Sequence, residues 1–239
     1  ALVGYFVWAH HMYTSGMSTT ARWVFSLLTF LVAVPSSIKV FNWVTTMYKG
    51  SIAIQPPFLF ALGFIFLFMI GGMTGLSLGA LATNIHVHDT AYVVAHFHYI
   101  VFGGVGFAFF AALFYWYPKM FGRMYDFKRA NWSFVFLFTG FNLLYFPQFV
   151  IGIMGMPRRY FDYLPQFTLG HQLSFVGAVL LVIGIVLMLV TLASKKGGRA
   201  AANPWGGKTF EWSIPSPPPV ENFDVMPEMG AKEEPYDYK

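Results

Sequence analysis

The chain has 239 residues, of which 56% are hydrophobic, 20% aromatic and only 10% charged, and it contains no cysteine. A soluble domain carries about 25% charged residues, so this composition excludes a soluble globule, a nucleic-acid-binding protein and a disulfide scaffold. Residues 1–194 hold nine basic and three acidic side chains, whereas residues 195–239 hold six and seven. The sequence therefore predicts an all-α polytopic membrane protein, with a transmembrane unit over 1–194 and a polar tail over 195–239.

The apolar stretches predict the membrane spans. A helix needs about 20 mostly apolar residues to cross the roughly 30 Å hydrocarbon core. Residues 1–16 are too short for this and are expected to be the end of a helix whose start is missing. Polar or turn residues bound each apolar stretch, such as Tyr117-Pro118-Lys119 after the third, and the ends are expected to within a few residues. The five predicted spans are about 21–47, 57–79, 91–117, 131–153 and 170–193.

Basic residues in the connections predict the orientation of the spans. Loop 118–130 and the segment that follows the last span are rich in Lys and Arg, so both should face the cytoplasm or the mitochondrial matrix. The connection 154–169 then lies on the outer side, where Arg158 and Arg159 break the charge rule. Two outer arginines indicate an anionic ligand held by forked hydrogen bonds. Contact with lipid headgroups is the alternative.

Two pairs of histidines are the strongest candidates for metal ligands. His10 and His11 are adjacent where the first segment ends, and irregular backbone there could turn both imidazoles onto one copper, zinc or iron ion. His96 and His98 lie inside the third span, where polar side chains are costly and usually functional. Residues two apart on an α-helix point about 200° apart. These two could therefore hold different cofactors on opposite faces, with Phe97 between them.

The other histidines have simpler interpretations. His86 and His171 are interpreted as hydrogen-bonded core or interfacial residues. This alternative also remains open for the paired histidines, although their arrangement in a chain so poor in polar groups favours ligation. His88 and Asp89 precede the third span, where the carboxylate suits either a helix cap or a site for a hard metal ion.

Lys39 is a charged residue in the interior of the first complete span. Inserting a lysine at a helix centre costs about 2.5–3.5 kcal/mol. Snorkelling of the side chain to the inner surface would explain its presence. The functional alternative is a proton relay, with Ser36 one turn away on the same face of the helix.

Several motifs together resemble one family, the haem–copper oxygen reductases, in the carboxy-terminal half of their large subunit (subunit I). The match covers nearly the whole chain, and the motifs are specific in this order and spacing, although each alone would be weak. They are residues 7–12 (VWAHHM), 35–41 (PSSIKVF), 88–99 (HDTAYVVAHFHY), 155–160 (GMPRRY), 211–212 (EW) and 216–219 (SPPP).

The resemblance implies a role for each candidate residue. His10 and His11 are similar to two of the three ligands of the copper in the binuclear centre. His96 resembles the axial ligand of the high-spin haem, and His98 resembles one axial ligand of the low-spin haem. The other implied roles are a proton path for Lys39 and Ser36, haem-propionate binding for Arg158 and Arg159, a magnesium site for His88 and Asp89, and a place between the haems for Phe97.

The resemblance also implies the whole function. It is that of a proton-pumping cytochrome c oxidase with a twelve-helix fold, which reduces oxygen to water with two haems, a type expected, copper and magnesium. The implied partners are the amino-terminal half of subunit I, subunit II with a copper centre, subunit III, cytochrome c and membrane lipid. The implied location is the bacterial inner membrane or the mitochondrial inner membrane, with the tail on the cytoplasmic or matrix side. The third copper ligand and the second low-spin haem ligand belong to the missing half, so activity is expected only with that half.

Two alternatives remain for the function. A quinol oxidase of the same superfamily is one, although Asp89 and Tyr99 favour cytochrome c as the donor, because quinol-using relatives tend to carry Asn at both positions. A non-catalytic channel or transporter would explain the spans and Lys39. It would give no reason for the paired histidines in the third span together with the outer arginines.

Overall fold

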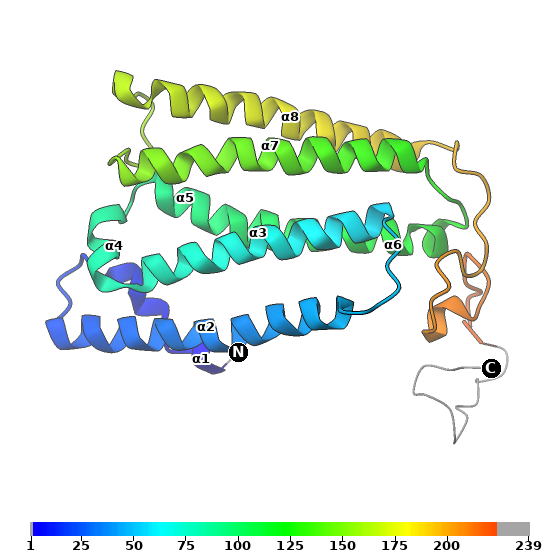
Figure 1. The fold of residues 1–239 in the computed structure, drawn as a ribbon, viewed down its shortest axis with the longest axis horizontal. Helices are drawn as coiled ribbons and strands as arrows, with labels where there is room; N and C mark the ends of the chain where they lie inside the picture. The colour runs from blue at the N-terminus through cyan, green and yellow to red at the C-terminus, as the bar shows by residue number, and fades with distance from the viewer. Residues whose placement is uncertain (1, 224–239) are drawn as a thin grey trace.

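The computed structural model describes residues 2–223, which form helices and connections with no named strand among them. The all-α prediction is therefore confirmed. Five helices are long and apolar enough to cross a membrane, as predicted, and they run along a common direction (Figure 1). The elements in chain order are α1 (Leu2–Tyr5), η1 (Trp8–Met12), α2 (Thr19–Met47), α3 (Pro56–Gly79), α4 (Leu81–Val87), α5 (Ala91–His98), η2 (Tyr99–Gly106), α6 (Phe107–Phe121), α7 (Phe127–Ile153), η3 (Pro165–Phe167), α8 (Thr168–Ala193) and η4 (Phe210–Trp212).

The third span is a continuous helix of 31 residues, Ala91–Phe121, built from α5, the π-helix η2 and α6. The helix continues a few residues past the apolar stretch predicted over 91–117, and Pro118 lies inside α6. The helix ends instead at Gly122, whose φ of +64° is the left-handed conformation that glycine adopts at helix ends without a Cβ penalty. A π-helix is rare and is frequently found at a functional site. Here it begins one residue after His98.

Helices α7 and α8 form an antiparallel pair along one side of the bundle (Figure 1). Glycines allow their backbones to touch. A Cβ added to Gly140 of α7 would lie 2.5 Å from the backbone nitrogen of Leu181, and one added to Gly177 of α8 would overlap the backbone of Leu144. Small residues at helix contacts are how membrane helices pack closely, because lipid removes the hydrophobic driving force between them.

Replacing Gly177 by alanine should therefore weaken the α7–α8 pair. The new methyl group would have to displace the α7 backbone rather than a flexible side chain, and overpacking of this kind costs about 1–3 kcal/mol. We expect a lower midpoint of thermal unfolding for Gly177→Ala in detergent solution. Gly72→Ala on α3 is the matched control, because no atom lies within 4 Å of the added Cβ. Equal midpoints for the two variants would contradict this account of the helix contact.

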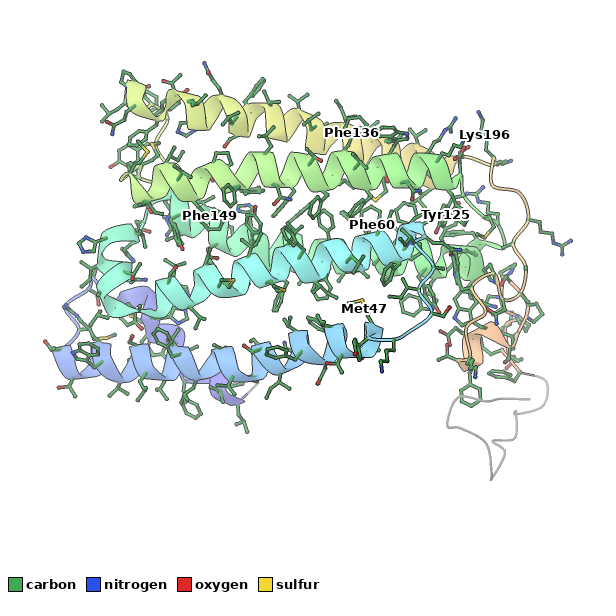
Figure 2. The ribbon with its side chains drawn as sticks, in the orientation of Figure 1. Met47, Phe60, Tyr125, Phe136, Phe149 and Lys196 are labelled. Carbon is green, nitrogen blue, oxygen red and sulfur yellow. The ribbon has the colours of Figure 1, made fainter. Side chains whose placement is uncertain are left out.

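Aromatic side chains fill the interior of the bundle. Phe60, Phe107 and Phe114 are fully buried, and the Phe60 ring packs edge-on against Phe134 of α7 with centroids 5.2 Å apart. Phe149 lies inside the bundle toward the opposite end (Figure 2). This core joins α3, α5, α6 and α7 into one unit that carries the histidines of α5.

Helix α2 is attached more loosely than the others. The structure describes every residue of α2, and Ser26 is the single buried one among them. Only 6% of the most apolar stretch of this helix is buried. In Figure 1 α2 lies on the far side of α3 from the α7–α8 pair. Most of its surface, including the side chain of Lys39, is consequently exposed in this chain.

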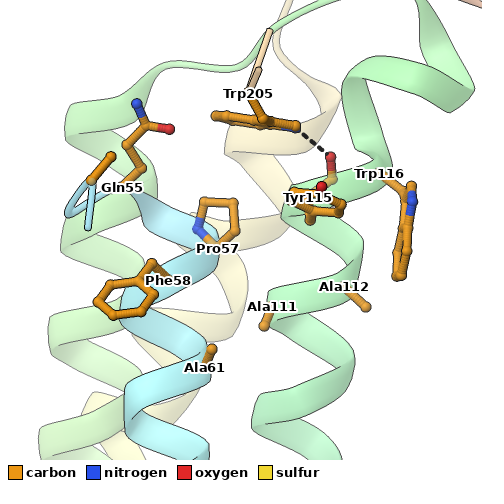
Figure 3. Close-up of a pocket in the computed structure, with 10 residues that line it drawn as sticks. Gln55, Pro57, Phe58, Ala61, Ala111, Ala112, Tyr115, Trp116 and Trp205 are labelled. Carbon is orange, nitrogen blue, oxygen red and sulfur yellow. Dashed lines mark hydrogen bonds between the residues drawn. The ribbon is translucent and has the colours of Figure 1, made fainter. Parts of the chain in front are cut away.

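The segment that follows α8 folds back onto the end of α6. Trp205 donates a 2.8 Å hydrogen bond from Nε1 to the carbonyl of Tyr115, and the two rings stack at 6.0 Å with an angle of 15°. These rings, with residues of α3 such as Pro57 and Ala61, line a cavity of about 450 Å³ (Figure 3). The tail up to residue 223 therefore forms a cap on this end of the bundle.

Lys119 is the anchor of this cap. Its ammonium group donates to the carbonyls of Ala202, Ile214 and Pro215 at 3.0, 2.7 and 3.3 Å, and only 5% of the residue is exposed. The sequence predicted a loop over residues 118–130, whereas the structure places Lys119 in the last turn of α6. A buried cation needs such partners because desolvation would otherwise neutralise it, and the returning tail supplies them.

Candidate metal and haem site

His10 and His11 lie in the short 3₁₀-helix η1, where their side chains converge. Their Nε2 atoms are 3.1 Å apart. Two nitrogen ligands of one tetrahedral metal ion at about 2.0–2.1 Å would be roughly 3.3 Å apart. The irregular backbone of η1 thus brings both imidazoles to one point, as a regular α-helix would not, and the spacing suits a shared metal ion.

Thr29 of α2 determines which nitrogen of His10 carries the proton. Its hydroxyl donates to the carbonyl of Phe25 at 2.6 Å, so at 3.2 Å from His10 Nδ1 it accepts a hydrogen bond. The proton is therefore assigned to Nδ1, and Nε2 keeps its lone pair. Burial lowers the pKa of His10 to about 4, and repulsion from His11 and His96 acts in the same direction. The ring is consequently neutral at physiological pH, which is the form that binds metals.

His96 projects from α5 toward α3. Its Nδ1 lies 3.0 Å from the carbonyl of Gly71 and 3.1 Å from the hydroxyl of Thr74. A carbonyl only accepts, so Nδ1 carries the proton and Nε2 is left for a metal. Gly75 makes room for the ring, since a Cβ there would lie 3.0 Å from Cε1 of His96. Metal-binding histidines are usually oriented by such a second hydrogen bond.

His98 uses a different partner on the other face of the same helix. Its Nδ1 donates to the carbonyl of Val94 at 2.8 Å, and its ring stacks on Tyr145 of α7 with centroids 4.2 Å apart and an angle of 17°. Because α5 is α-helical through His98, the two histidines point about 200° apart. Phe97 lies between them in the sequence and is 40% exposed.

Three of the histidines present the same nitrogen atom, Nε2, for binding to iron or copper. His10, His96 and His98 each direct Nδ1 to a protein oxygen and leave Nε2 for a metal. His10 and His96 are also near enough for their charges to interact. Within residues 2–223 the structure brings together no group of three His, Cys, Asp or Glu side chains. The pair on η1 therefore offers two ligands of a metal site.

Asp89 and Arg158 join the connection before α5 to the one after α7. The carboxylate Oδ1 lies 2.6 Å from the guanidinium, and the backbone nitrogen of Arg158 donates to the carbonyl of Asp89 at 2.9 Å. Nε2 of His88 is 3.6 Å from the other carboxylate oxygen. Magnesium requires near-octahedral oxygen ligands, and one carboxylate paired with arginine beside an imidazole does not supply them. The geometry therefore lends the predicted magnesium site no support.

The same connections hold two strained residues. Asp89 and Arg159 have φ values of +53° and +69°, a conformation that costs a non-glycine residue about 1–3 kcal/mol and clusters at functional sites. Nε of Arg158 is buried and has no hydrogen-bond partner among the described residues. Buried polar groups are normally paired, so an anionic group beside Arg158 would satisfy this donor.

Lys39 and Ser36 lie on α2, away from these histidines along the chain. The Lys39 ammonium is 5.9 Å from the centre of the Phe68 ring of α3. No hydrogen bond between Lys39 and Ser36 is present in the described part of the chain, although the two residues are one turn apart on one face. The structure places both on the weakly covered side of the bundle.

Several residues that orient the histidines were missed in the sequence. Thr29 and Thr74 are polar residues inside apolar spans, and that contrast could have identified them. Gly71 and Tyr145 carried no such signal, because one acts through its backbone carbonyl and the other is one of many aromatic residues.

The five apolar helices and the converging histidines describe a helical membrane protein whose imidazole nitrogens have a geometry that fits metal ions. The matching family model is described as "Cytochrome C and Quinol oxidase polypeptide I" and covers residues 1–180. The chain belongs to this family, which confirms the resemblance inferred from its motifs.

The curated relatives carry a narrower name than the family model does. The chain is 43% identical over 238 residues to "Cytochrome c oxidase subunit 1" of Thermostichus vulcanus, which covers 99% of this chain and 43% of that protein. It is 44% identical over 232 residues to the protein of the same name from Bacillus sp. (strain PS3), with 95% and 38% covered. The chain thus spans about two fifths of the length of these curated relatives.

A solved structure supports the same fold. A heme-copper terminal oxidase dimer determined by cryo-EM matches with a TM-score of 0.73 and 29% sequence identity, covering 83% of this chain and 41% of that one. Together with the five apolar helices, this establishes an integral membrane protein. The relatives and the solved structure named here are oxidases, not channels or transporters.

Proposed function

We propose that this chain forms part of the catalytic subunit of a proton-pumping cytochrome c oxidase, an enzyme that reduces oxygen to water at a haem–copper centre. The observation that carries the proposal is the shared orientation of His10, His96 and His98, whose Nδ1 atoms are each bound to a protein oxygen. This orientation leaves three Nε2 lone pairs for metals, in a chain whose curated relatives are named cytochrome c oxidase subunit 1.

Each histidine then has one assignment. His10 and His11 would hold copper, His96 the iron of a high-spin haem, and His98 the iron of a low-spin haem. When bound, these groups would carry electrons and reduce oxygen, and haems of the a type are the proposed pair. The opposite directions of His96 and His98 support two separate haems, with Phe97 between them. Arg158 and Arg159 would bind haem propionates, which suits the unpartnered Nε of Arg158.

The chain's own residues also have roles in moving protons. Lys39 lies within the membrane part of α2 and could hold a proton on Nζ, with Ser36 one turn away. The side chains around the site exclude water from the bundle core, where the aromatic residues of α3, α5 and α7 are packed. We leave magnesium out of this scheme because the carboxylate of Asp89 is committed to Arg158.

The partners follow from the incomplete ligand set. The amino-terminal half of the large subunit would supply the missing ligands and cover the exposed face of α2, and subunits II and III would complete the complex. Cytochrome c is the proposed electron donor. The cap end of the bundle carries basic residues on both the α6–α7 connection and the tail, so by the charge rule it would face the cytoplasm of a bacterium or the mitochondrial matrix, with the chain in that inner membrane.

Optical spectroscopy of the complex that contains this chain tests the proposal. We expect two haem components in the reduced-minus-oxidised spectrum, with carbon monoxide shifting only the one assigned to His96. The same preparation should oxidise reduced cytochrome c while it consumes oxygen. A complex without haem bands would refute the function, and consumption with a quinol but not with cytochrome c would replace the proposed donor.

A further inference from the structure

The ring of His98 is held by more than its backbone hydrogen bond. The bond from Nδ1 to the carbonyl of Val94 is 2.8 Å long and fixes the direction of one nitrogen. It leaves the ring free to tilt about that direction. Two neighbouring aromatic rings limit this tilt: Tyr145 is stacked at 4.2 Å and 17°, and Phe97 lies at 4.3 Å and 31°.

Tyr145 is the more constraining of the two rings. Phe97 is adjacent to His98 in the chain and 40% exposed, so surrounding side chains hold its ring on only part of its surface. Tyr145 comes from α7 and packs against Phe141 with centroids 5.0 Å apart. Phe141 is itself fully buried and stacks at 5.6 Å and 9° on Phe102 of the π-helix. The buried ring of Phe141 therefore holds Tyr145 in place beside His98.

We propose that Tyr145 is a positioning residue that sets the plane of the His98 imidazole, and with it the orientation of this axial ligand on the low-spin haem. The inference rests on the proposed function, in which His98 binds that iron. The contacts around a metal-binding imidazole determine its rotation as well as its tautomer. When a haem is bound, the rotation of the His98 ring would be recorded in the paramagnetic spectrum of its ferric iron.

The stacking needs the ring of Tyr145 and not its hydroxyl group. Tyr145→Phe retains the ring and should leave the ligand plane unchanged, whereas Tyr145→Leu removes it. Phe146→Leu is the matched control for loss of an aromatic side chain from α7, because Phe146 neighbours Tyr145 in the chain, is 54% exposed and packs against Phe149 instead.

The experiment is electron paramagnetic resonance of the oxidised complex, with the haem-to-protein ratio measured in parallel. We expect Tyr145→Leu to shift the g values of the low-spin haem by more than the linewidth and to broaden the signal. Tyr145→Phe and Phe146→Leu should match the unaltered complex. Unchanged g values in Tyr145→Leu at full haem content would overturn the inference while the proposed function stands.

Two further outcomes are decided by the same measurements. If the leucine variant does not assemble, Tyr145→Met, whose flexible side chain fills space without a ring, takes its place with the same expected shift. Unchanged g values in that variant would also overturn the inference. If the unaltered complex shows no low-spin haem signal, the proposed function fails first and this inference fails with it.

Discussion

Replacing His98 by alanine should remove the low-spin haem from the complex while the five spans remain inserted. No other described side chain on that face of α5 offers a nitrogen at the same place, since His96 points to the opposite face. Loss of an outer partner of a metal ligand already costs about 10–100-fold in affinity, and loss of the ligand itself should cost more. The low-spin bands of the reduced-minus-oxidised spectrum should therefore vanish at an unchanged protein level.

The haem assigned to His96 shows whether the loss in His98→Ala is limited to the low-spin haem. His96 keeps its bonds to Gly71 and Thr74 in this variant, so the component that binds carbon monoxide should persist. His86→Ala is the matched control, because His86 is exposed on α4 and has no assigned ligand role. Normal low-spin haem content in His98→Ala would show that another residue binds that iron.

The spans could be predicted because a membrane imposes a simple rule on the chain. About 20 apolar residues are needed to cross it, and five stretches satisfy this regardless of how they pack. The direction of the two α5 histidines could also be predicted, since helical geometry alone separates them. The last turn of the third helix could not be predicted by the same reasoning, because the apolar stretch ends before Pro118 whereas the helix continues to Phe121 and is capped by Gly122.

Contacts between distant segments were beyond the reach of local patterns. Tyr145 meets His98 across 47 positions, and Lys119 meets Pro215 across 96. Nothing in a single sequence distinguishes Tyr145 from the other tyrosines, or Lys119 from the other lysines near it. The π-helix after His98 was missed for a different reason, because no local pattern in residues 99–106 sets it apart from an ordinary apolar helix.

The ion pair between Asp89 and Arg158 joins two residues that the sequence analysis interpreted separately. From the sequence, Asp89 is predicted to be a metal ligand or a helix cap, and Arg158 is predicted to bind an anion. Their 2.6 Å contact makes them one unit that links two connections at the same end of the bundle. The carboxylate then compensates part of the arginine charge, and Arg158 Nε remains the donor available to an anionic ligand.

Replacing Lys39 by methionine should reduce oxygen consumption by about 100-fold or more, the size of effect typical of a lost proton-transfer group. The position of the ammonium argues against snorkelling. The ammonium lies 5.9 Å from the centre of the Phe68 ring. Phe68 is 12 residues from Pro56 and 11 residues from Gly79 along α3, which places the Lys39 charge near mid-span. The Cα–Cβ bond also tilts toward the helix N-terminus, away from the nearer end of α2 at Met47.

A snorkelling lysine would place its ammonium group at the membrane surface. A charge near mid-span raises the free energy of insertion, and a functional role explains why it is present. Methionine is one atom shorter than lysine and lacks the group that can carry a proton, so the packing of α2 against α3 stays nearly unchanged. The measurements are steady-state oxygen consumption and the rate at which the carbon monoxide-binding haem is reduced without oxygen. Lys49→Met is the control, because Lys49 is exposed beyond the end of α2. Turnover of Lys39→Met equal to that of Lys49→Met would leave the intramembrane lysine without a role in proton delivery.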